Sequence, residues 1–425
     1  MSEQQRLSLN ARILAGLVAG LVVGIILGAI DVDWVDQYLV AGLFDVVGKL
    51  FVNALQMLVV PLVLVSLICG ASSLSDPSRL GRVGGKAVGL YLLTTGIAIS
   101  LALFAGLVME PGSGIELRQQ SLEIEQAPPL REVIVNLVPS NPVQAMAEGN
   151  MLPIIIFAIL VGVAITLSGE RGRRVGELFG DLNAVVMRLV HLVMRIAPYG
   201  VFALITVLGA TTGTEIFGEL ATYVLLVLAI LLVQVLVTYP ALLLLFTGLG
   251  PLTFLRKLRT AQMFAFSTAS SNATIPVTLE TAEQRLGAHN NVAAFTVPLG
   301  ATINMDGTAI MQGIATAFIA QAYGVDLTLT QYLTVVLMVI MASIGAAGVP
   351  GVGLILLAGV LTQVGLPREA IGMLLGVDRI LDMTRTAVNI TGDAMVTTVV
   401  AKSEGELDLA TYKDPAAGFN LQSHS

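Results

Sequence analysis

The amino-acid sequence predicts an all-α polytopic membrane protein with eight transmembrane helices, two re-entrant helical hairpins and inverted repeats. Three observations support this fold class. Of the 425 residues, 55% are hydrophobic and only 12% are charged, which is about half the charged share of a soluble domain. Several uncharged runs reach the length of about 18 to 20 residues that crosses a bilayer. Two further apolar segments are broken by glycine, proline and polar residues. These observations exclude a soluble enzyme.

The predicted spans follow the uncharged runs. They occupy residues 10–30, 40–73, 83–110, 130–168, 175–210, 216–249, 290–323 and 368–402. Arg6 and Arg12 precede the first run and would also suit a signal peptide, but the spans that follow at once favour an uncleaved first helix. Asp45 and Lys49 stand four residues apart in the second span, so we interpret them as a structural ion pair.

Basic residues in the short loops predict the orientation. They cluster at 79–86, 171–174 and 256–259, whereas an alternate loop carries Glu116 and Glu123. By the positive-inside rule, the basic loops and both termini face the cytoplasm. We therefore expect a multi-pass protein of the cell inner membrane or plasma membrane. The polar residues 403–425 are expected to form a loose cytoplasmic tail.

Segments 252–287 and 327–366 do not fit ordinary spans. As a single helix the second would measure about 60 Å, twice the hydrocarbon thickness. Its middle reads GAAGVPGVG at 345–353, which a helix carries poorly. The first segment places Ser270, Ser271 and Asn272 near its centre. Both are predicted to be helical hairpins whose polar tips meet inside the membrane, because irregular backbone at that depth is tolerated only when it is buried in protein or lines a cavity.

The last span carries polar residues along one face. At about 100° per residue, six of them fall within an arc of about 100°: Asp378, Asp382, Arg385, Thr386, Asn389 and Asp393. A charge at mid-membrane costs roughly 2.5–3.5 kcal/mol unless it is paired or hydrated. The face could be a salt-bridge ladder that only joins helices. Asn and Thr in the same arc favour a binding site instead, because charge pairing does not require them.

The seventh span contains GATINMDGTA at 300–309. Asn304 and Asp306 would point about 200° apart on a regular helix, so the segment predicts an unwound turn that binds a hard cation through carbonyls and a carboxylate. A glycine kink beside a cavity is the alternative. Tyr91, Thr94 and Thr95 in the third span, taken alone, fit ordinary helix packing better than a site.

Four motifs occur in order: STASSNATIPVT (267–278), NMDGT (304–308), GAAGVPGVG (345–353) and DRILDMTRTAVNITGD (378–393). Together they resemble the glutamate/aspartate transporter family, the dicarboxylate/amino acid:cation symporters, over nearly the whole chain. The resemblance implies a homotrimer. Residues 1–82 (helices 1 and 2) and 112–212 (helices 4 and 5) would form a fixed scaffold. Residues 83–111 (helix 3) and 213–402 (helix 6 to helix 8 with both hairpins) would form a transport domain that moves like an elevator.

The resemblance also implies which residues bind substrate. Arg385 would bind a side-chain carboxylate and Asp382 an amino group, since a guanidinium fork suits a carboxylate. The remaining contacts would come from the side chains of Thr308, Thr386 and Asn389 and from the backbone of Ser271, Val349 and Gly353.

Three sodium sites follow from the same resemblance, and oxygen cages suit such hard cations. The first would comprise Asp393 with carbonyls of Gly300, Asn304 and Asn389. The second would comprise Thr302, Ser343 and Ile344, and the third Tyr91, Thr94, Thr95, Asn304 and Asp306. Gln312 stands where potassium-exchanging relatives carry Glu, which argues against potassium exchange.

The implied function is secondary symport, not enzyme catalysis: uptake of an acidic amino acid, aspartate or glutamate, with co-transported sodium ions. Membrane lipid is an expected partner, and the net charge of −7 gives no reason to expect nucleic acid. The three scattered histidines make a histidine metal site improbable. Two alternatives stay open: a proton-coupled glutamate/dicarboxylate symporter and a channel. A membrane enzyme is disfavoured because no nucleophile–base pair has a recognisable spacing.

Overall fold

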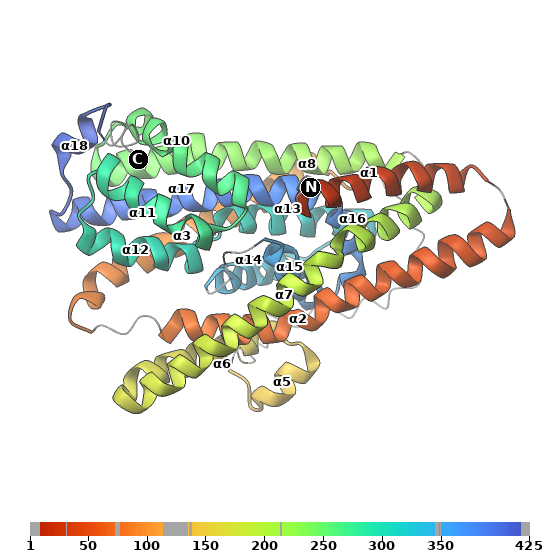
Figure 1. Cartoon of the computed structure of the whole chain (residues 1–425), viewed down its shortest axis with the longest axis horizontal. Coiled ribbons are helices and arrows are strands. Elements are labelled where there is room, and N and C mark those ends of the chain that lie inside the picture. Colours follow the sequence, from red (N-terminus) through yellow and green to blue (C-terminus); the bar gives the residue numbers. More distant parts are fainter. Residues whose placement is uncertain are drawn as a thin grey trace, which may run out of the picture.

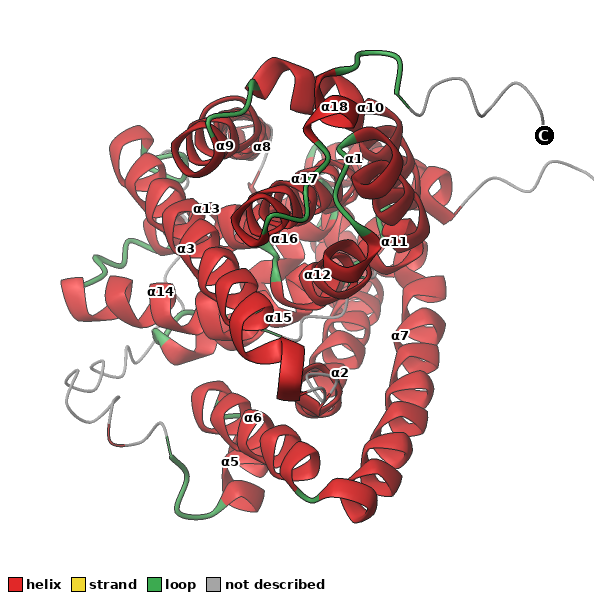
Figure 2. Ribbon diagram, turned by 90° about the vertical axis from the view of Figure 1, so that its left-hand side faces the viewer, coloured by secondary structure: helices red, strands yellow, loops and turns green. Residues whose placement is uncertain are grey.

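The computed structural model describes residues 9–30, 32–72, 77–113, 135, 138–212, 215–344, 348 and 350–417, and within these ranges it contains helices and no β-strand. Figures 1 and 2 show an all-helical bundle. Its all-α class agrees with the prediction. The predicted span residues 130–134, 136 and 137 lie outside the described ranges, as do residues 345–347 and Val349 of the second hairpin tip, most of the loop after the third span and the end of the tail.

The first half of the chain forms helices at the predicted spans. They are α1 (Leu9–Gly28), η1 (Val35–Phe44), α2 (Asp45–Ser72), α3 (Pro77–Met109), α5 (Pro142–Glu148), α6 (Met151–Leu167) and α7 (Gly169–Thr212). Asp45 and Lys49 form the predicted ion pair at 2.7 Å. The predicted fourth span is divided, because Gly149 has a left-handed φ of 70° and ends α5.

The second half is more broken. It contains α8 (Glu215–Val233), the π-helical η2 (Gln234–Thr238), α9 (Tyr239–Thr247), α10 (Pro251–Thr268), α11 (Ser271–Glu280), η3 (Thr281–Arg285), α12 (Asn290–Ile303), α13 (Asp306–Ala322), α14 (Leu329–Ser343), α15 (Val352–Gln363), η4 (Arg368–Ala370), α16 (Ile371–Leu375), α17 (Asp378–Glu404) and α18 (Leu409–Lys413). The predicted eighth span is therefore not one helix, because a break at Gly376 and Val377 separates α16 from α17.

Helices α1 and α7 pack backbone against backbone through glycines spaced four apart. A Cβ atom added at Gly16, Gly20 or Gly24 would lie 2.5, 2.6 and 2.6 Å from carbonyl oxygens of α7. Only glycine permits this approach, which is the small-residue packing typical of membrane helices. Helix α7 also packs on α2, and α2 on α6, and Figure 2 shows α2, α6 and α7 in its lower part.

A second group of helices surrounds α17. Helix α13 packs on α3 and α17, and both α10 and α12 pack on α17. Figure 2 shows α3, α12, α13 and α17 running side by side above α2 and α6. This group includes both hairpins, which the structure forms from α10 with α11 and from α14 with α15.

The two hairpin tips meet, as predicted. Ser270 Oγ donates a 2.7 Å hydrogen bond to the Gly348 carbonyl, and the Asn272 N–H donates to the same oxygen at 3.1 Å. Ser270 also accepts from the Ala273 N–H at the N-terminus of α11, a capping contact that satisfies a free backbone donor. The tips therefore close one end of the region between α13 and α17.

Apolar side chains remain exposed on the outer faces of the bundle. They include Val18, Leu50, Phe104, Leu225 and Leu245, exposed by 57, 63, 65, 66 and 75%. By length and composition, Arg82–Met109 and Gly218–Thr247 qualify as membrane spans within the described residues. The pair Gly169–Val190 and Arg195–Thr211 qualifies if counted as one span bent by 45°. Pro198 explains this bend, since it cannot donate to the carbonyl four residues before it.

The beginning of the C-terminal tail is not loose, which corrects the expectation. Lys257 Nζ donates to the carbonyls of Arg285 and Thr411, both at 2.6 Å. Tyr412 is buried, and its hydroxyl donates to the Gly250 carbonyl. The polar composition of the tail concealed these contacts, which fasten α18 to the base of the first hairpin.

Candidate functional site

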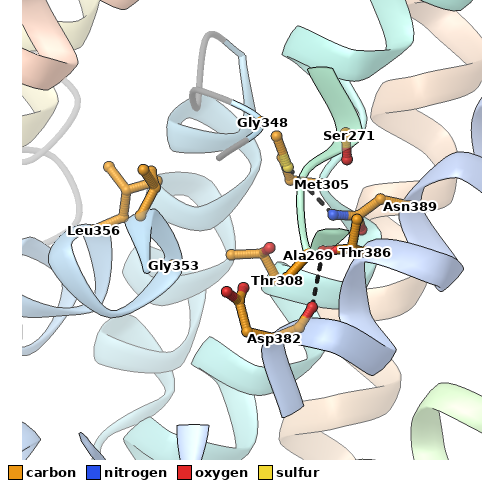
Figure 3. Close-up of a pocket in the computed structure, with 11 residues that line it drawn as sticks. Ala269, Ser271, Met305, Thr308, Gly348, Gly353, Leu356, Asp382, Thr386 and Asn389 are labelled. Atoms are coloured by element: carbon orange, nitrogen blue, oxygen red, sulfur yellow. Dashed lines mark hydrogen bonds between the residues drawn. The ribbon is translucent and has the colours of Figure 1, made fainter. Parts of the chain in front are cut away.

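A cavity lies between the two hairpin tips, α13 and α17 (Figure 3). The cavity volume is about 20 Å³, which is room for about one water molecule, so the hairpin tips must move apart to admit an amino acid. It is lined by Ala269, Ser271, Met305, Thr308, Gly348, Val352, Gly353, Leu356, Asp382, Thr386 and Asn389. Six of the eight predicted substrate residues line this cavity: Ser271, Thr308, Gly353, Asp382, Thr386 and Asn389. Val349 lies outside the described residues.

Arg385 lies behind the cavity wall rather than on it. Its side chain is 1% exposed, and Nη2 lies 2.8 Å from Asp382 Oδ1 and 3.0 Å from Asp378 Oδ1. The Nε and Nη1 atoms of this guanidinium are buried without a hydrogen-bond partner. Nη1 faces the second hairpin, where a Cβ atom on Gly353 would lie only 3.1 Å from it. Part of the donor capacity of Arg385 is therefore uncommitted beside the cavity.

Asp382 joins α17 to the second hairpin. Its Oδ2 accepts a hydrogen bond from the Gly351 N–H at 3.1 Å and lies 3.6 Å from Arg379 Nη1. The Gly353 carbonyl accepts a bond from Gln312 Nε2 at 3.0 Å. These two contacts add to the bonds from Ser270 and Asn272 to Gly348 in holding the hairpin over the cavity. Thr386 Oγ1 donates to the Asp382 carbonyl of its own helix, the bond drawn in Figure 3.

The predicted break in the seventh span is present. Helix α12 ends at Ile303 and α13 begins at Asp306, with Asn304 and Met305 in non-helical conformations. The break turns Asp306 toward α3, where Thr95 Oγ1 donates to its Oδ1 at 2.7 Å. Thr94 Oγ1 lies 3.3 Å from Asn304 Oδ1. Four of the five residues of the predicted third sodium site are therefore brought together.

Asp393 forms a second buried carboxylate near this break. Its Oδ1 accepts a bond from Asn304 Nδ2 at 2.9 Å, and the same Nδ2 donates to the Asn389 carbonyl at 3.2 Å. Oδ2 of Asp393 is buried with no partner. A Cβ atom on Gly300 would lie 2.5 Å from Asp393 Oδ1. The structure thus brings together all residues of the predicted first sodium site.

Some predicted ligands are directed elsewhere. Thr302 Oγ1 donates to the Leu299 carbonyl, and Ser343 Oγ to the Ile340 carbonyl. No hydrogen bond joins Thr302 to Ser343 or Ile344, all of which the structure describes. The Tyr91 hydroxyl donates to the Thr296 carbonyl. The second predicted sodium site stays a prediction, since cation ligands need not bond to one another.

Two residues beside Asp306 were missing from the predicted sites. Tyr239 and Gln234 both donate to Asp306 Oδ2, at 2.8 and 3.2 Å. A polar residue in the uncharged run of the sixth span was the available signal, and Gln234 is such a residue. No group of three or more His, Cys, Asp or Glu side chains able to hold a metal occurs among the described residues. Any cation here would depend on single carboxylates, hydroxyls, amides and carbonyls.

The amino-acid sequence is similar to those of known symporters. The sequence profile of the sodium:dicarboxylate symporter family matches residues 9–403. The chain is 37% identical to the proton/glutamate-aspartate symporter of Escherichia coli (strain K12) over 389 residues, covering 88% of each chain. It is 34% identical to the proton/sodium-glutamate symport protein of Geobacillus stearothermophilus over 377 residues, covering 86% of this chain and 89% of that one. It is 32% identical to the C4-dicarboxylate transport protein of Bacillus subtilis (strain 168) over 381 residues, covering 88% and 90%.

Proposed function

The chain belongs to the sodium:dicarboxylate symporter family, and we propose that it takes up aspartate or glutamate together with sodium ions. It is a transporter and not an enzyme, because the family and the relatives that it matches are symporters. The substrate assignment rests on the unsatisfied hydrogen-bond donors of Arg385. This guanidinium is buried beside a small polar cavity, and two of its nitrogen atoms have no hydrogen-bond partner.

A carboxylate of the substrate is the group that Arg385 lacks. Charge-assisted bonds between guanidinium and carboxylate are strong and specific in geometry. Arg385 is now paired with Asp382 and Asp378. When a substrate carboxylate reaches Arg385, Asp382 becomes available for a substrate ammonium group. This exchange favours an acidic amino acid over a plain dicarboxylate, which brings no ammonium group.

The cation assignment rests on two buried carboxylates. Asp306 and Asp393 are each 0% exposed, and no Lys, Arg or His among the described residues forms an ion pair with either. A buried ionised carboxylate without a counter-charge is costly. A sodium ion at each carboxylate, held with the neighbouring carbonyls and hydroxyls, would supply that counter-charge. We therefore propose co-transported sodium ions rather than a permanently bound metal.

The remaining parts of the proposal concern architecture. The chain crosses the inner or plasma membrane eight times, with two re-entrant hairpins and both termini in the cytoplasm. It forms a homotrimer embedded in lipid through residues 1–82 and 112–212. Residues 83–111 and 213–402 move as an elevator. The packing of α7 on α1, α2 and α6, and of α10, α12 and α13 on α17, supports this division.

Proton coupling is the second candidate, because the Escherichia coli relative is named a proton/glutamate-aspartate symporter. Uptake of labelled aspartate into proteoliposomes separates the candidates. We expect an inward sodium gradient at constant pH to drive accumulation, and excess glutamate to inhibit it more than excess succinate. Accumulation driven by a pH gradient without sodium would overturn the sodium assignment. Uptake of labelled succinate with no effect of aspartate would overturn the substrate assignment, and flux that does not saturate would indicate a channel.

A further inference from the structure

The π-helical segment η2 places two polar side chains on one oxygen of Asp306. Tyr239 donates its hydroxyl to Oδ2 at 2.8 Å, and Gln234 donates through Nε2 to the same atom at 3.2 Å. Both side chains are fully buried. They come from η2 and the first residue of α9, and neither belongs to the sites proposed above.

The bulge is what brings these two residues together. On a regular α-helix, residues five apart point about 140° away from each other. In η2 the Tyr239 N–H bonds to the Gln234 carbonyl, five residues earlier. This hydrogen-bond pattern defines a π-helix, which is rare and frequently occurs at functional sites. The wider turn places residues five apart nearly above one another, so that both can contact Asp306.

The two donors use the acceptor capacity of one carboxylate oxygen. A carboxylate offers about four acceptor positions, two on each oxygen. Tyr239 and Gln234 occupy both positions of Oδ2, whereas Oδ1 accepts from Thr95, and the Thr94 hydroxyl also lies beside this carboxylate. The acceptor position that remains lies on Oδ1, the oxygen beside α3. Asp306 is thereby fixed with its free position directed to the proposed cation site.

Two observations argue that Gln234 and Tyr239 do more than pack in the core. Gln234 Oε1 is buried without a partner, so this amide satisfies Asp306 while leaving its own oxygen unsatisfied, at a cost to folding. Tyr239 is also wedged against α17. A Cβ atom on Gly392 would lie 2.7 Å from the Tyr239 hydroxyl and 2.5 Å from Asn304 Nδ2. Tyr239 therefore touches Asp306 on one side and the residue before Asp393 on the other.

We propose that Gln234 and Tyr239 are positioning residues of the cation site, which hold Asp306 so that Oδ1 is presented to the ion. This inference rests on the proposed sodium coupling. Removing either donor frees one of the two acceptor positions of Oδ2 and weakens the hold on the orientation of the carboxylate. The affinity for sodium then falls, while the residues that contact the amino acid stay in place.

The variants Tyr239→Phe and Gln234→Leu test this role in the full-length protein. We expect the sodium concentration for half-maximal aspartate binding to rise about tenfold in each, since bonds to charged groups are worth more than neutral ones. Aspartate affinity at saturating sodium is expected to stay within about twofold. Tyr412→Phe is the matched control for a buried tyrosine, since its hydroxyl donates to the Gly250 carbonyl. Gln262→Leu is the control for a glutamine, since it removes an amide contact to Thr391 instead. Both controls are expected to keep the wild-type sodium dependence.

The possible outcomes are distinct. A wild-type protein that binds aspartate without sodium defeats the proposed function itself. Sodium-dependent wild-type binding with unchanged sodium dependence in both variants overturns the positioning role alone. An equal loss of sodium and aspartate affinity indicates a structural role and also overturns it. Thermal stabilisation by sodium without aspartate gives a second readout, and Gln234→Met replaces Gln234→Leu if the latter does not fold.

Discussion

Arg385 Nη2 lies 2.8 Å from Asp382 Oδ1, so the two side chains proposed to bind opposite ends of the substrate are bound to each other. Asp382 also accepts from the Gly351 N–H of the second hairpin. A substrate that separates Asp382 from Arg385 therefore changes a contact that holds the hairpin. Substrate recognition and the position of the hairpin are linked through one carboxylate.

Arg385→Cys is expected to abolish binding of aspartate. Losing one partner of a buried ion pair costs roughly 3–5 kcal/mol, and no other guanidinium among the described residues contacts both Asp378 and Asp382. Small neutral amino acids such as serine are expected to bind instead, because Asp382 can still accept from an ammonium group. Calorimetry in sodium with aspartate, serine and succinate checks this. Arg368→Cys on the surface is the control. Near-original aspartate affinity in Arg385→Cys would make Arg385 a purely structural charge.

Asp393→Asn is expected to weaken sodium-dependent aspartate binding far more than it weakens folding. The amide is nearly isosteric and keeps an oxygen that can accept from Asn304, but it removes a buried negative charge. The cost of burying that charge disappears with it, so thermal stability without ligand should be unchanged or higher. Sodium titrations of aspartate binding and thermal unfolding provide the two measurements, with Asp408→Asn as a surface control. An unchanged sodium dependence would remove Asp393 from the site.

The contact between α3 and the end of α17 should depend on pH. Lys86 Nζ lies 2.6 Å from Glu404 Oε1, and Arg82 Nε lies 2.9 Å from Oε2. The hydrogen bonds from Lys86 and Arg82 lower the pKa of Glu404. A lowered pKa means that the contact stabilises the fold above the ordinary glutamate pKa of about 4.3, and that this stabilisation is lost as the pH falls through the lowered value.

Glu404→Gln is the variant that isolates this contact. We expect its melting temperature to lie below that of the wild type at neutral pH, and the difference to vanish in acid once Glu404 is protonated. Thermal unfolding of both proteins across the acid range measures the effect. A difference that persists unchanged in acid would show that the charge of Glu404 does not stabilise this junction.

Gly20→Ala should destabilise the pairing of α1 with α7. The new methyl group would lie 2.6 Å from the Phe202 carbonyl oxygen, and such overpacking costs typically 1–3 kcal/mol. Gly89→Ala on α3 is the matched control, since a Cβ atom there meets nothing within 4 Å. Alanine should even favour that helix by about 1 kcal/mol. Thermal unfolding of the two purified variants decides it, and equal melting temperatures would contradict close packing at Gly20.

The sequence alone determined the features that follow from the cost of placing polar groups in lipid. The stripe from Asp378 to Asp393 had to face the protein interior, and these residues are buried, whereas Ile380 of the same helix is 46% exposed. The NMDGT segment had to break its helix, and it does so at Asn304 and Met305. The meeting of the hairpin tips followed from the same requirement. Each of these inferences used only local composition and helical periodicity.

The tertiary structure decided which partners these groups have. From the sequence alone, Thr95 fits an ordinary packing residue of α3. In the structure it donates a hydrogen bond to Asp306, more than two hundred positions further along the chain. Gln234 and Tyr239 reach one oxygen because a π-helical turn changes their relative direction, which a calculation with a regular helical repeat cannot produce. The contact of Arg385 with Asp382 is likewise one of several pairings that the charges on that face allow. Periodicity determines the face on which a side chain lies, but the partner that it meets depends on how close the helix backbones approach.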